Sequence, residues 1–217
     1  MHSRTPRLHS AAMIEVDYDK LTSEFIGWRR NEHAIKLKNN PDAGRILHFV
    51  KGLHFSALLI YQIRIWLSGS GLKVDWGHIF HSTQGYCSRE CDIIIHTGGI
   101  NGRWNGQGGD HPIMDFKFVF SDHVKAVISC KAFVKPSNID KTYCESIKKY
   151  TDNIWLFAEY CGPESHDAIR QEAQISQYQH FWCLYSMNQK GDINKYMIDW
   201  YDFHDAVMDL KGLFVNR

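Results

Sequence analysis

Two short apolar runs with charged ends constrain this chain more than any other feature. Residues 124–131 read Val-Lys-Ala-Val-Ile-Ser-Cys-Lys, and residues 91–96 read Cys-Asp-Ile-Ile-Ile-His. Such runs of about four to eight residues, rich in β-branched side chains, are typical of buried strands. Because side chains two apart on a strand point to the same face, Ser129 and Lys131 should share one face. The two runs therefore predict the middle of a β-sheet.

Helical and strand-like segments surround these two runs. Apolar residues at three- and four-residue spacing predict helices over 14–38 and 43–67, with Pro41 ending the first. Residues 97–112 are rich in glycine without periodicity and are predicted to form a loop. The order predicts an α/β fold in which a mixed sheet is flanked by helices and preceded by an N-terminal helical segment. The remaining predicted helices are 137–150 with Ser137 as N-cap, 164–179 and 205–210; the remaining strands are 74–80, 115–120, 153–159, 181–186 and 195–201.

Length and composition place the chain among ordinary globular proteins. With 217 residues, 44% of them apolar and 23% charged, it suits one compact domain. No apolar run reaches the roughly 18 residues of a membrane span, and no apolar signal core opens the chain, so we expect a cytoplasmic protein without membrane contact. The six cysteines are scattered along the chain, a pattern that predicts reduced thiols rather than disulfides. A zinc site at Cys87 and Cys91 is not expected, because no second Cys/His pair has the required spacing.

Asp92 and Lys131 lie on two strands that could bring an acidic and a basic side chain close together. A phosphodiesterase site needs oxygen ligands for a divalent metal and a cation near the reacting oxygen. We predict that Asp92 and the backbone carbonyl of Cys130 are metal ligands and that Lys131 is the catalytic lysine. Mg²⁺ is the expected ion, with Mn²⁺ as a substitute. The alternative is that Asp92 caps a turn and Lys131 is an ordinary strand-end charge.

These residues resemble the PD-(D/E)xK nuclease superfamily, which has the restriction-endonuclease-like fold. The resemblance is carried by Asp92-Ile-Ile-Ile95 and Ala126-Val-Ile-Ser-Cys-Lys131, and it departs from the pattern where Ser129 replaces the expected glutamate. One branch of type II restriction endonucleases is similar in using Ser-x-Lys, with the missing carboxylate about thirteen residues beyond the lysine. Glu145 has that spacing. The resemblance implies that Asp92 and Glu145 bind metal, that Lys131 is catalytic, and that Ser129 marks the vacated position in the catalytic site.

Helical phase gives a different answer for Glu145. If the helix packs through Ile139, Tyr143 and Ile147, Glu145 lies on nearly the opposite face, among lysines. Glu90, two residues before Asp92 and on the same strand face, is the reserve carboxylate.

By this resemblance the chain is expected to be a Mg²⁺-dependent endonuclease that hydrolyses DNA in restriction or anti-phage defence, without a small-molecule cofactor. A homodimer is a further expectation, because two sites can cut two strands. The net charge of +1 requires any DNA affinity to come from a local patch. The alternative is a degenerate module that binds nucleic acid or a partner protein without cleavage. The expected DNA contacts are Lys135, Asn138, Lys141 and Arg103; the expected parts of the domain are a helical extension over 1–42, a catalytic core over 43–160 and a C-terminal part over 161–217.

Overall fold

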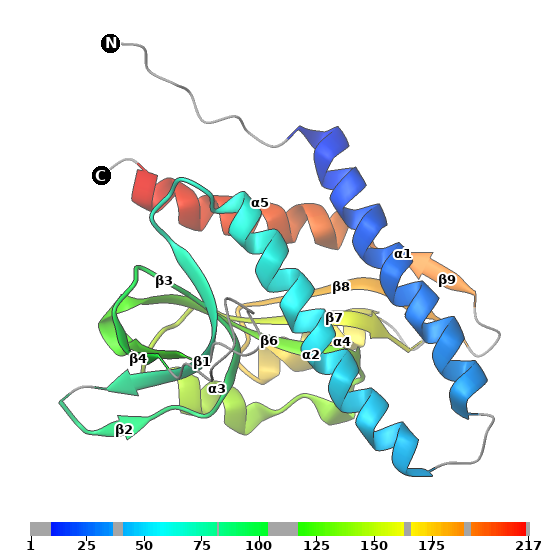
Figure 1. Cartoon of the computed structure of the whole chain (residues 1–217), viewed down its shortest axis with the longest axis horizontal. Coiled ribbons are helices and arrows are strands. Elements are labelled where there is room, and N and C mark those ends of the chain that lie inside the picture. The colour runs from blue at the N-terminus through cyan, green and yellow to red at the C-terminus, as the bar shows by residue number, and fades with distance from the viewer. Residues whose placement is uncertain are drawn as a thin grey trace.

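The computed structural model describes residues 10–36, 41–81, 83–103, 117–162, 166–188 and 192–215, without the side chains of 28–49, 100–103 and 215. Its helices and strands follow one another along the chain in Figure 1. The helices are α1 (Ala11–Lys36), α2 (Pro41–Trp66), α3 (Lys141–Ile147), α4 (His166–Ile175) and α5 (Met197–Val215), with 3₁₀ turns at Ser121–His123 and Pro136–Asn138. The strands are β1 (Lys73–His81), β2 (Tyr86–Cys87), β3 (Cys91–His96), β4 (Ile100–Arg103), β5 (Lys117–Phe120), β6 (Val124–Val134), β7 (Ile154–Cys161), β8 (His180–Met187) and β9 (Ile193–Lys195).

The described strands form one mixed sheet, which confirms the predicted α/β fold class. Its order is β4-β5-β1-β3-β6-β7-β8-β9, with β2 paired to β1. The long strand β6 lies in the middle, antiparallel to β3 and parallel to β7. Helices α3 and α4 connect the parallel strands β6, β7 and β8, as parallel pairing requires a crossover. The sheet therefore changes from antiparallel to parallel pairing at β6.

Apolar side chains cover both faces of the sheet. On one face, which we call the α2 side, Phe55, Trp66 and Trp200 from α2 and α5 pack with Ile93 and Ile128 of the central strands. On the other, the α3 side, residues of α3 and α4 pack with Ile94 and Val127. Consecutive residues of β3 and β6 thus point to opposite cores, as the period of a strand requires. Burial on both faces explains why the two runs are almost continuously apolar.

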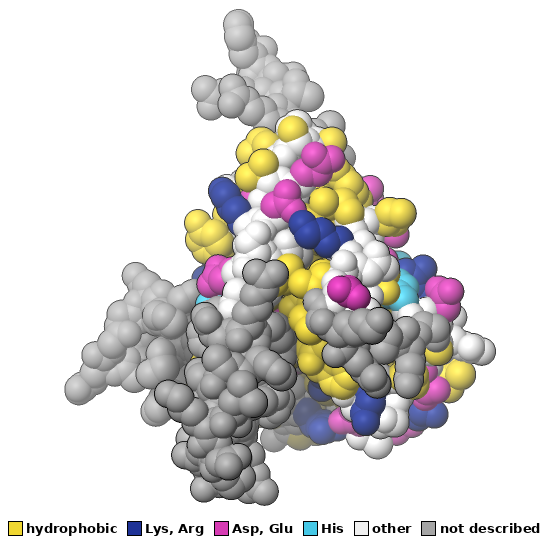
Figure 2. Space-filling model, turned by 90° about the vertical axis from the view of Figure 1, so that its right-hand side faces the viewer, with side chains coloured by type: hydrophobic (Ala, Val, Ile, Leu, Met, Phe, Trp, Pro, Cys, Tyr) yellow, Lys and Arg dark blue, Asp and Glu magenta, His cyan; other side chains and the backbone are white. Residues whose placement is uncertain are grey.

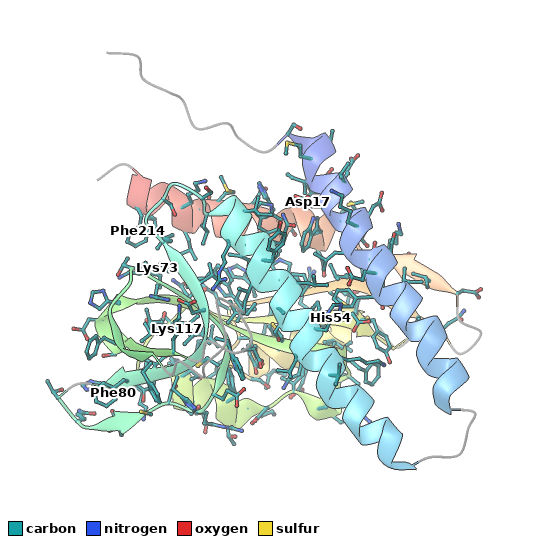
Figure 3. The ribbon with its side chains drawn as sticks, in the orientation of Figure 1. Asp17, His54, Lys73, Phe80, Lys117 and Phe214 are labelled. Atoms are coloured by element: carbon teal, nitrogen blue, oxygen red, sulfur yellow. The ribbon has the colours of Figure 1, made fainter. Side chains whose placement is uncertain are left out.

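Helices α1 and α2 lie side by side over the α2 side (Figure 1). Figure 3 labels two side chains between them. Asp17 of α1 accepts a hydrogen bond of 2.8 Å from Gln62 Nε2, and His54 Nε2 of α2 lies 2.9 Å from Glu24 Oε1. Such contacts join α1 to the body of the fold.

Several predicted boundaries were wrong. Pro41 does not merely end a helix but begins α2, because a first helical residue needs no N–H partner. Ser137 is not the N-cap of α3; Asp140 is, and its side chain accepts from the main-chain N–H groups of Thr142 and Tyr143. The predicted loop over 97–112 contains β4. The predicted strand 195–201 and helix 205–210 are replaced by the end of β9 and by α5.

The six cysteines are free thiols, as predicted. Among the described residues, no helix is long and apolar enough to cross a membrane. Figure 2 shows the face at the right-hand side of Figure 1, where acidic, basic and apolar side chains are interspersed. The described part of that face therefore presents no surface of a single charge sign.

Candidate active site

Asp92 lies at the start of β3, at the end of its pairing with β6. The last registered pair is Ile93 with Ile128, so one further residue along each strand brings Asp92 opposite Ser129. Side chains at opposite positions of an antiparallel pair are about 5 Å apart at their Cβ atoms. The main-chain N–H of Cys130 donates to Asp92 Oδ2 at 2.7 Å. The structure therefore brings Asp92 and Ser129 together.

The charge of Asp92 is held in a poorly solvated position. Burial raises its pKa, and the negative charge of Glu90 acts in the same direction. The Cys130 N–H, the positive charge of Lys131 and the hydroxyl of Ser129 act in the opposite direction but do not outweigh burial. A carboxylate in such a place gains from any additional positive charge beside it, which is what a metal ligand requires.

The other residues predicted on β6 lie on both sides of the strand. Ser129 is 2% exposed, and the half-buried Lys131 follows it by two residues. The thiol of Cys130 packs on the α2 side, near Ser56 of α2, and burial raises its pKa well above the usual value. Because the N–H and C=O of one strand residue leave the same edge, the Cys130 carbonyl is directed toward Asp92 as its N–H is.

The two further carboxylates lie outside this buried group. Glu145 is exposed on α3, whose buried residues are Tyr143, Cys144 and Ile147. The helical phase predicted this exposed face, and the thirteen-residue spacing does not by itself bring Glu145 to Asp92. Glu90 is exposed too, but its charge acts on Asp92, and its Oε1 accepts a hydrogen bond of 2.8 Å from Trp76 Nε1. Of the two, Glu90 is electrostatically coupled to Asp92.

Three of the four predicted DNA contacts follow the end of β6 along the chain. Lys135 is exposed, and its main-chain N–H donates to Asn138 Oδ1 at 2.9 Å. Asn138 Nδ2 donates to the Phe133 carbonyl at 3.2 Å. Lys141 is exposed and forms an ion pair of 3.1 Å with Glu172. Arg103 belongs to β4, but its side chain lies outside the described residues.

Three residues near Asp92 were not predicted from the sequence. Arg89 donates from Nη1 to Asp140 at 3.0 Å and lies over the Tyr143 ring at 5.9 Å, so it joins the β3 end of the site to α3. The rings of Tyr143 and Tyr178 are stacked on the α3 side, with centroids 6.5 Å apart. Arg89, three residues before Asp92, could have been found by its position; the tyrosines could not, because core tyrosines are common.

The residues present fit a divalent ion incompletely. Asp92 and the Cys130 carbonyl supply two oxygens of the kind that Mg²⁺ prefers, and Mg²⁺ commonly binds through one or two carboxylates with several waters. Within the part of the chain that the structure describes, no three His, Cys, Asp or Glu side chains converge as metal ligands. Any ion held here would therefore depend on water for most of its coordination.

A second group of charges lies elsewhere in the sheet, around Asp75 of β1. Its side chain is 5% exposed; Oδ1 lies 2.8 Å from Arg64 Nη2 and 3.1 Å from Lys117 Nζ. Oδ2 lies 2.8 Å from Nε2 of the fully buried His96. Figure 3 shows Lys117 in this part of the sheet. Because the Gly98 N–H donates to His96 Nδ1 at 3.0 Å, the proton of the imidazole is on Nε2, directed at Asp75.

A cavity of about 600 Å³ lies apart from Asp92, between α4, α5 and the starts of β7 and β8. Its walls include Trp155, Trp182 and the aspartates of α5, and of the residues discussed above it shares Tyr178. Acidic walls suit neither a phosphate backbone nor the predicted chemistry. We therefore place the candidate site at Asp92.

No protein-family model and no curated protein matches this chain. Solved structures that share its fold include two of NucC. NucC of Pseudomonas aeruginosa ATCC27853 in the cAAA-bound form is 8% identical, with a TM-score of 0.55 over 97% of this chain and 100% of that chain. NucC of Escherichia coli MS115-1, also cAAA-bound, is 8% identical, with a TM-score of 0.53 over 98% of this chain and 100% of that chain. At this identity the likeness concerns the fold: the chain has the mixed α/β, nuclease-like fold of NucC.

Proposed function

We propose that this protein is a metal-dependent endonuclease that hydrolyses DNA phosphodiester bonds at Asp92 and Lys131. The observation that carries the proposal is the Cys130 N–H bonded to Asp92, which places the acid beside the strand of Lys131 in a nuclease-like fold. The restriction or anti-phage setting rests on the sequence resemblance and on the likeness to NucC.

The described residues divide the work among themselves. Asp92 Oδ1 and the Cys130 carbonyl would hold Mg²⁺, which when bound supplies a Lewis acid for the phosphate and an activated water. The Cys130 N–H fixes the orientation of the Asp92 carboxylate. The positive charge of Lys131 acts on Asp92 and would stabilise the negative charge that develops on the phosphate oxygens. Arg89 and Lys135, both exposed near the same end of the sheet, would contact the DNA backbone.

The origin of a second carboxylate is a separate question. Glu145 stays the prediction from spacing, and Glu90 is the candidate that already acts on Asp92. Removing Glu145 should cost little stability, because the side chain is exposed. If Glu145 is the second metal ligand, as the spacing predicts, Glu145→Ala should lower cleavage by orders of magnitude. If Glu90 is that ligand, Glu90→Ala should have this effect instead. The exposed Asp152→Ala serves as a matched control for both.

A degenerate module on the same fold is the second candidate. It is favoured by Ser129 at the position where the resemblance expects an acid, and by the sparse set of described ligands. Such a module would bind DNA with strong salt dependence, or bind a partner protein, but would leave phosphodiester bonds intact.

Plasmid cleavage with Mg²⁺ or Mn²⁺ separates the two candidates. We expect nicked or linear product from the wild type and none from Asp92→Asn or Lys131→Ala, with circular dichroism confirming that the variants fold. Because NucC is described in a cAAA-bound form, the assay is run with and without cAAA. An intact plasmid under all conditions, together with no heat of Mn²⁺ binding, would refute the enzyme proposal.

A further inference from the structure

Two buried tyrosine hydroxyls lie near the candidate site, and within the described part of the chain neither has a hydrogen-bond partner. Tyr143 of α3 is 7% exposed, and Tyr178, just before β8, is 3% exposed. Both hydroxyl oxygens are fully buried, and neither forms a hydrogen bond of normal geometry with a described residue. A buried hydroxyl that forms no hydrogen bond costs free energy, whereas phenylalanine would fill the same space without that cost. A bound water or ligand is therefore expected to satisfy them.

The surroundings of both hydroxyls point toward the same place. The Tyr143 hydroxyl lies near the Cys91 thiol and feels the negative charge of Asp92; burial, with these neighbours, raises the pKa of Tyr143 well above its usual value. The Tyr178 hydroxyl lies near Ser129 and Cys144, and burial raises the pKa of Tyr178 as well. Both phenols therefore keep their protons and can each donate one hydrogen bond and accept others.

Ser129, Tyr143 and Tyr178 thus gather three hydroxyls on the α3 side of Asp92. We name this group the hydroxyl pocket. It lies around position 129, where the resemblance expects a carboxylate. A carboxylate would reach a metal ion directly, whereas hydroxyls of this kind reach it through a water molecule. Mg²⁺ retains several of its waters in proteins, and the groups that hold such waters strengthen metal binding.

We propose that the hydroxyl pocket binds waters of a divalent metal ion held by Asp92, and that it takes the place of the missing carboxylate at position 129. In this arrangement the metal-bound waters donate to the tyrosine and serine oxygens. Tyr143 and Tyr178 are positioning residues in this arrangement, since they act through water. The inference rests on the proposed metal site at Asp92. It makes the serine part of a working site rather than a sign of its loss.

The test measures Mn²⁺ affinity by isothermal titration for the full chain and for Tyr143→Phe, Tyr178→Phe and the double variant. Loss of a group that holds a metal ligand typically weakens binding by about 10- to 100-fold, and we expect that range for each single variant. Tyr150→Phe is the matched control: its hydroxyl is also buried and has no hydrogen-bond partner among the described residues. Its titratable neighbours include Tyr86, Cys87 and Cys91 but not Asp92, and Lys149 Nζ lies 5.1 Å from its ring centroid. Its affinity should stay within about twofold of the wild type, the scatter between closely matched variants.

A second readout needs no metal. If the pocket holds water in the metal-free protein, Tyr143→Phe and Tyr178→Phe lower the urea midpoint of unfolding, whereas removal of a truly unsatisfied hydroxyl raises it. Should either variant fail to fold, Ser129→Ala removes the third hydroxyl and carries the same expectation for Mn²⁺ affinity.

The outcomes separate this inference from the proposed function. If Asp92→Asn abolishes Mn²⁺ binding while both tyrosine variants keep wild-type affinity, the hydroxyl pocket is refuted and the metal site stands. If the wild type binds no Mn²⁺, or Asp92→Asn leaves binding unchanged, both proposals fail. Weaker binding by the two tyrosine variants, with Tyr150→Phe unchanged, supports the pocket.

Discussion

Asp75→Asn tests how much the buried charge cluster in β1 contributes to folding. Burial alone would raise the pKa of Asp75, but the hydrogen bond from His96 and the charge of Lys117 outweigh it and lower the pKa from 3.8 to about 2. At about 1.4 kcal/mol per pH unit, this change corresponds to a preference of about 2 kcal/mol for the ionised carboxylate in the folded state. Asparagine lacks that charge, and if its Oδ1 keeps the contact with Lys117 Nζ, its Nδ2 faces His96 Nε2, which is also a donor. We expect a loss of at least about 2 kcal/mol at pH 7.

The pH dependence gives the sign of the same effect. A carboxyl whose pKa is lower in the folded than in the unfolded state contributes its full stability above the unfolded value, and that stability is lost as pH falls through the folded value. The wild type should therefore lose this contribution between about pH 4 and pH 2, and Asp75→Asn should lack that part of the slope. Urea unfolding at several pH values measures both quantities, with the exposed Asp209→Asn as control. A variant within about 0.5 kcal/mol of the wild type, with the wild-type slope, would refute the reasoning.

Three further substitutions follow from local geometry. Gly77→Ala would place a Cβ 1.9 Å from the Lys117 carbonyl oxygen, at a φ of +154°, so we expect a loss of about 3 kcal/mol or more and a lower Tm in calorimetry. Asp140→Ala removes the N-cap of α3 and should lower the free energy of unfolding in urea by about 1–2 kcal/mol. If Asp140→Asn restores full stability, the loss is due to capping and not to the ion pair with Arg89. Lys141→Ala breaks an exposed ion pair with Glu172 and should change the free energy of unfolding by less than about 1 kcal/mol. If Lys141 contacts a DNA phosphate, the same substitution should reduce the slope of log affinity against log salt concentration by about one.

The central strands could be predicted because their signal is local. Residues 91–96 match β3 at both ends, and the run from Val124 begins β6, although β6 continues to Val134 beyond the predicted end. The last strand and helix could not be predicted in the same way. The stretch 195–201 is aromatic enough to suggest a strand, but Trp200, Phe203 and Val207 recur at helical spacing and pack against the α2 side. Tertiary packing of the whole α5 face decides the matter, and a seven-residue window does not contain it.

In the candidate site, too, some residues could be predicted from the local sequence and others depend on the three-dimensional fold. Asp92 and Lys131 could be proposed from the sequence because each is a charged residue at the edge of an apolar run. The positions of Glu90 and Glu145 relative to Asp92 depend on how the ends of β3 and α3 lie in space, which spacing along the chain does not determine. That the hydroxyls of Tyr143 and Tyr178 have no hydrogen-bond partner among the described residues depends on three-dimensional neighbours alone.

The pairing of β3 with β6 has a consequence for how relatives of this protein could be recognised. Asp92 and Ser129 are neighbours because of strand register, and the 36 residues between them leave the central pair and return to it. Insertions or deletions in that excursion need not move either end. Across a lineage, the count from the acid to the lysine should therefore drift, while the opposition of the two strand positions persists. A search pattern that fixes the paired strands and leaves the intervening length free should find kin that a pattern of fixed spacing overlooks.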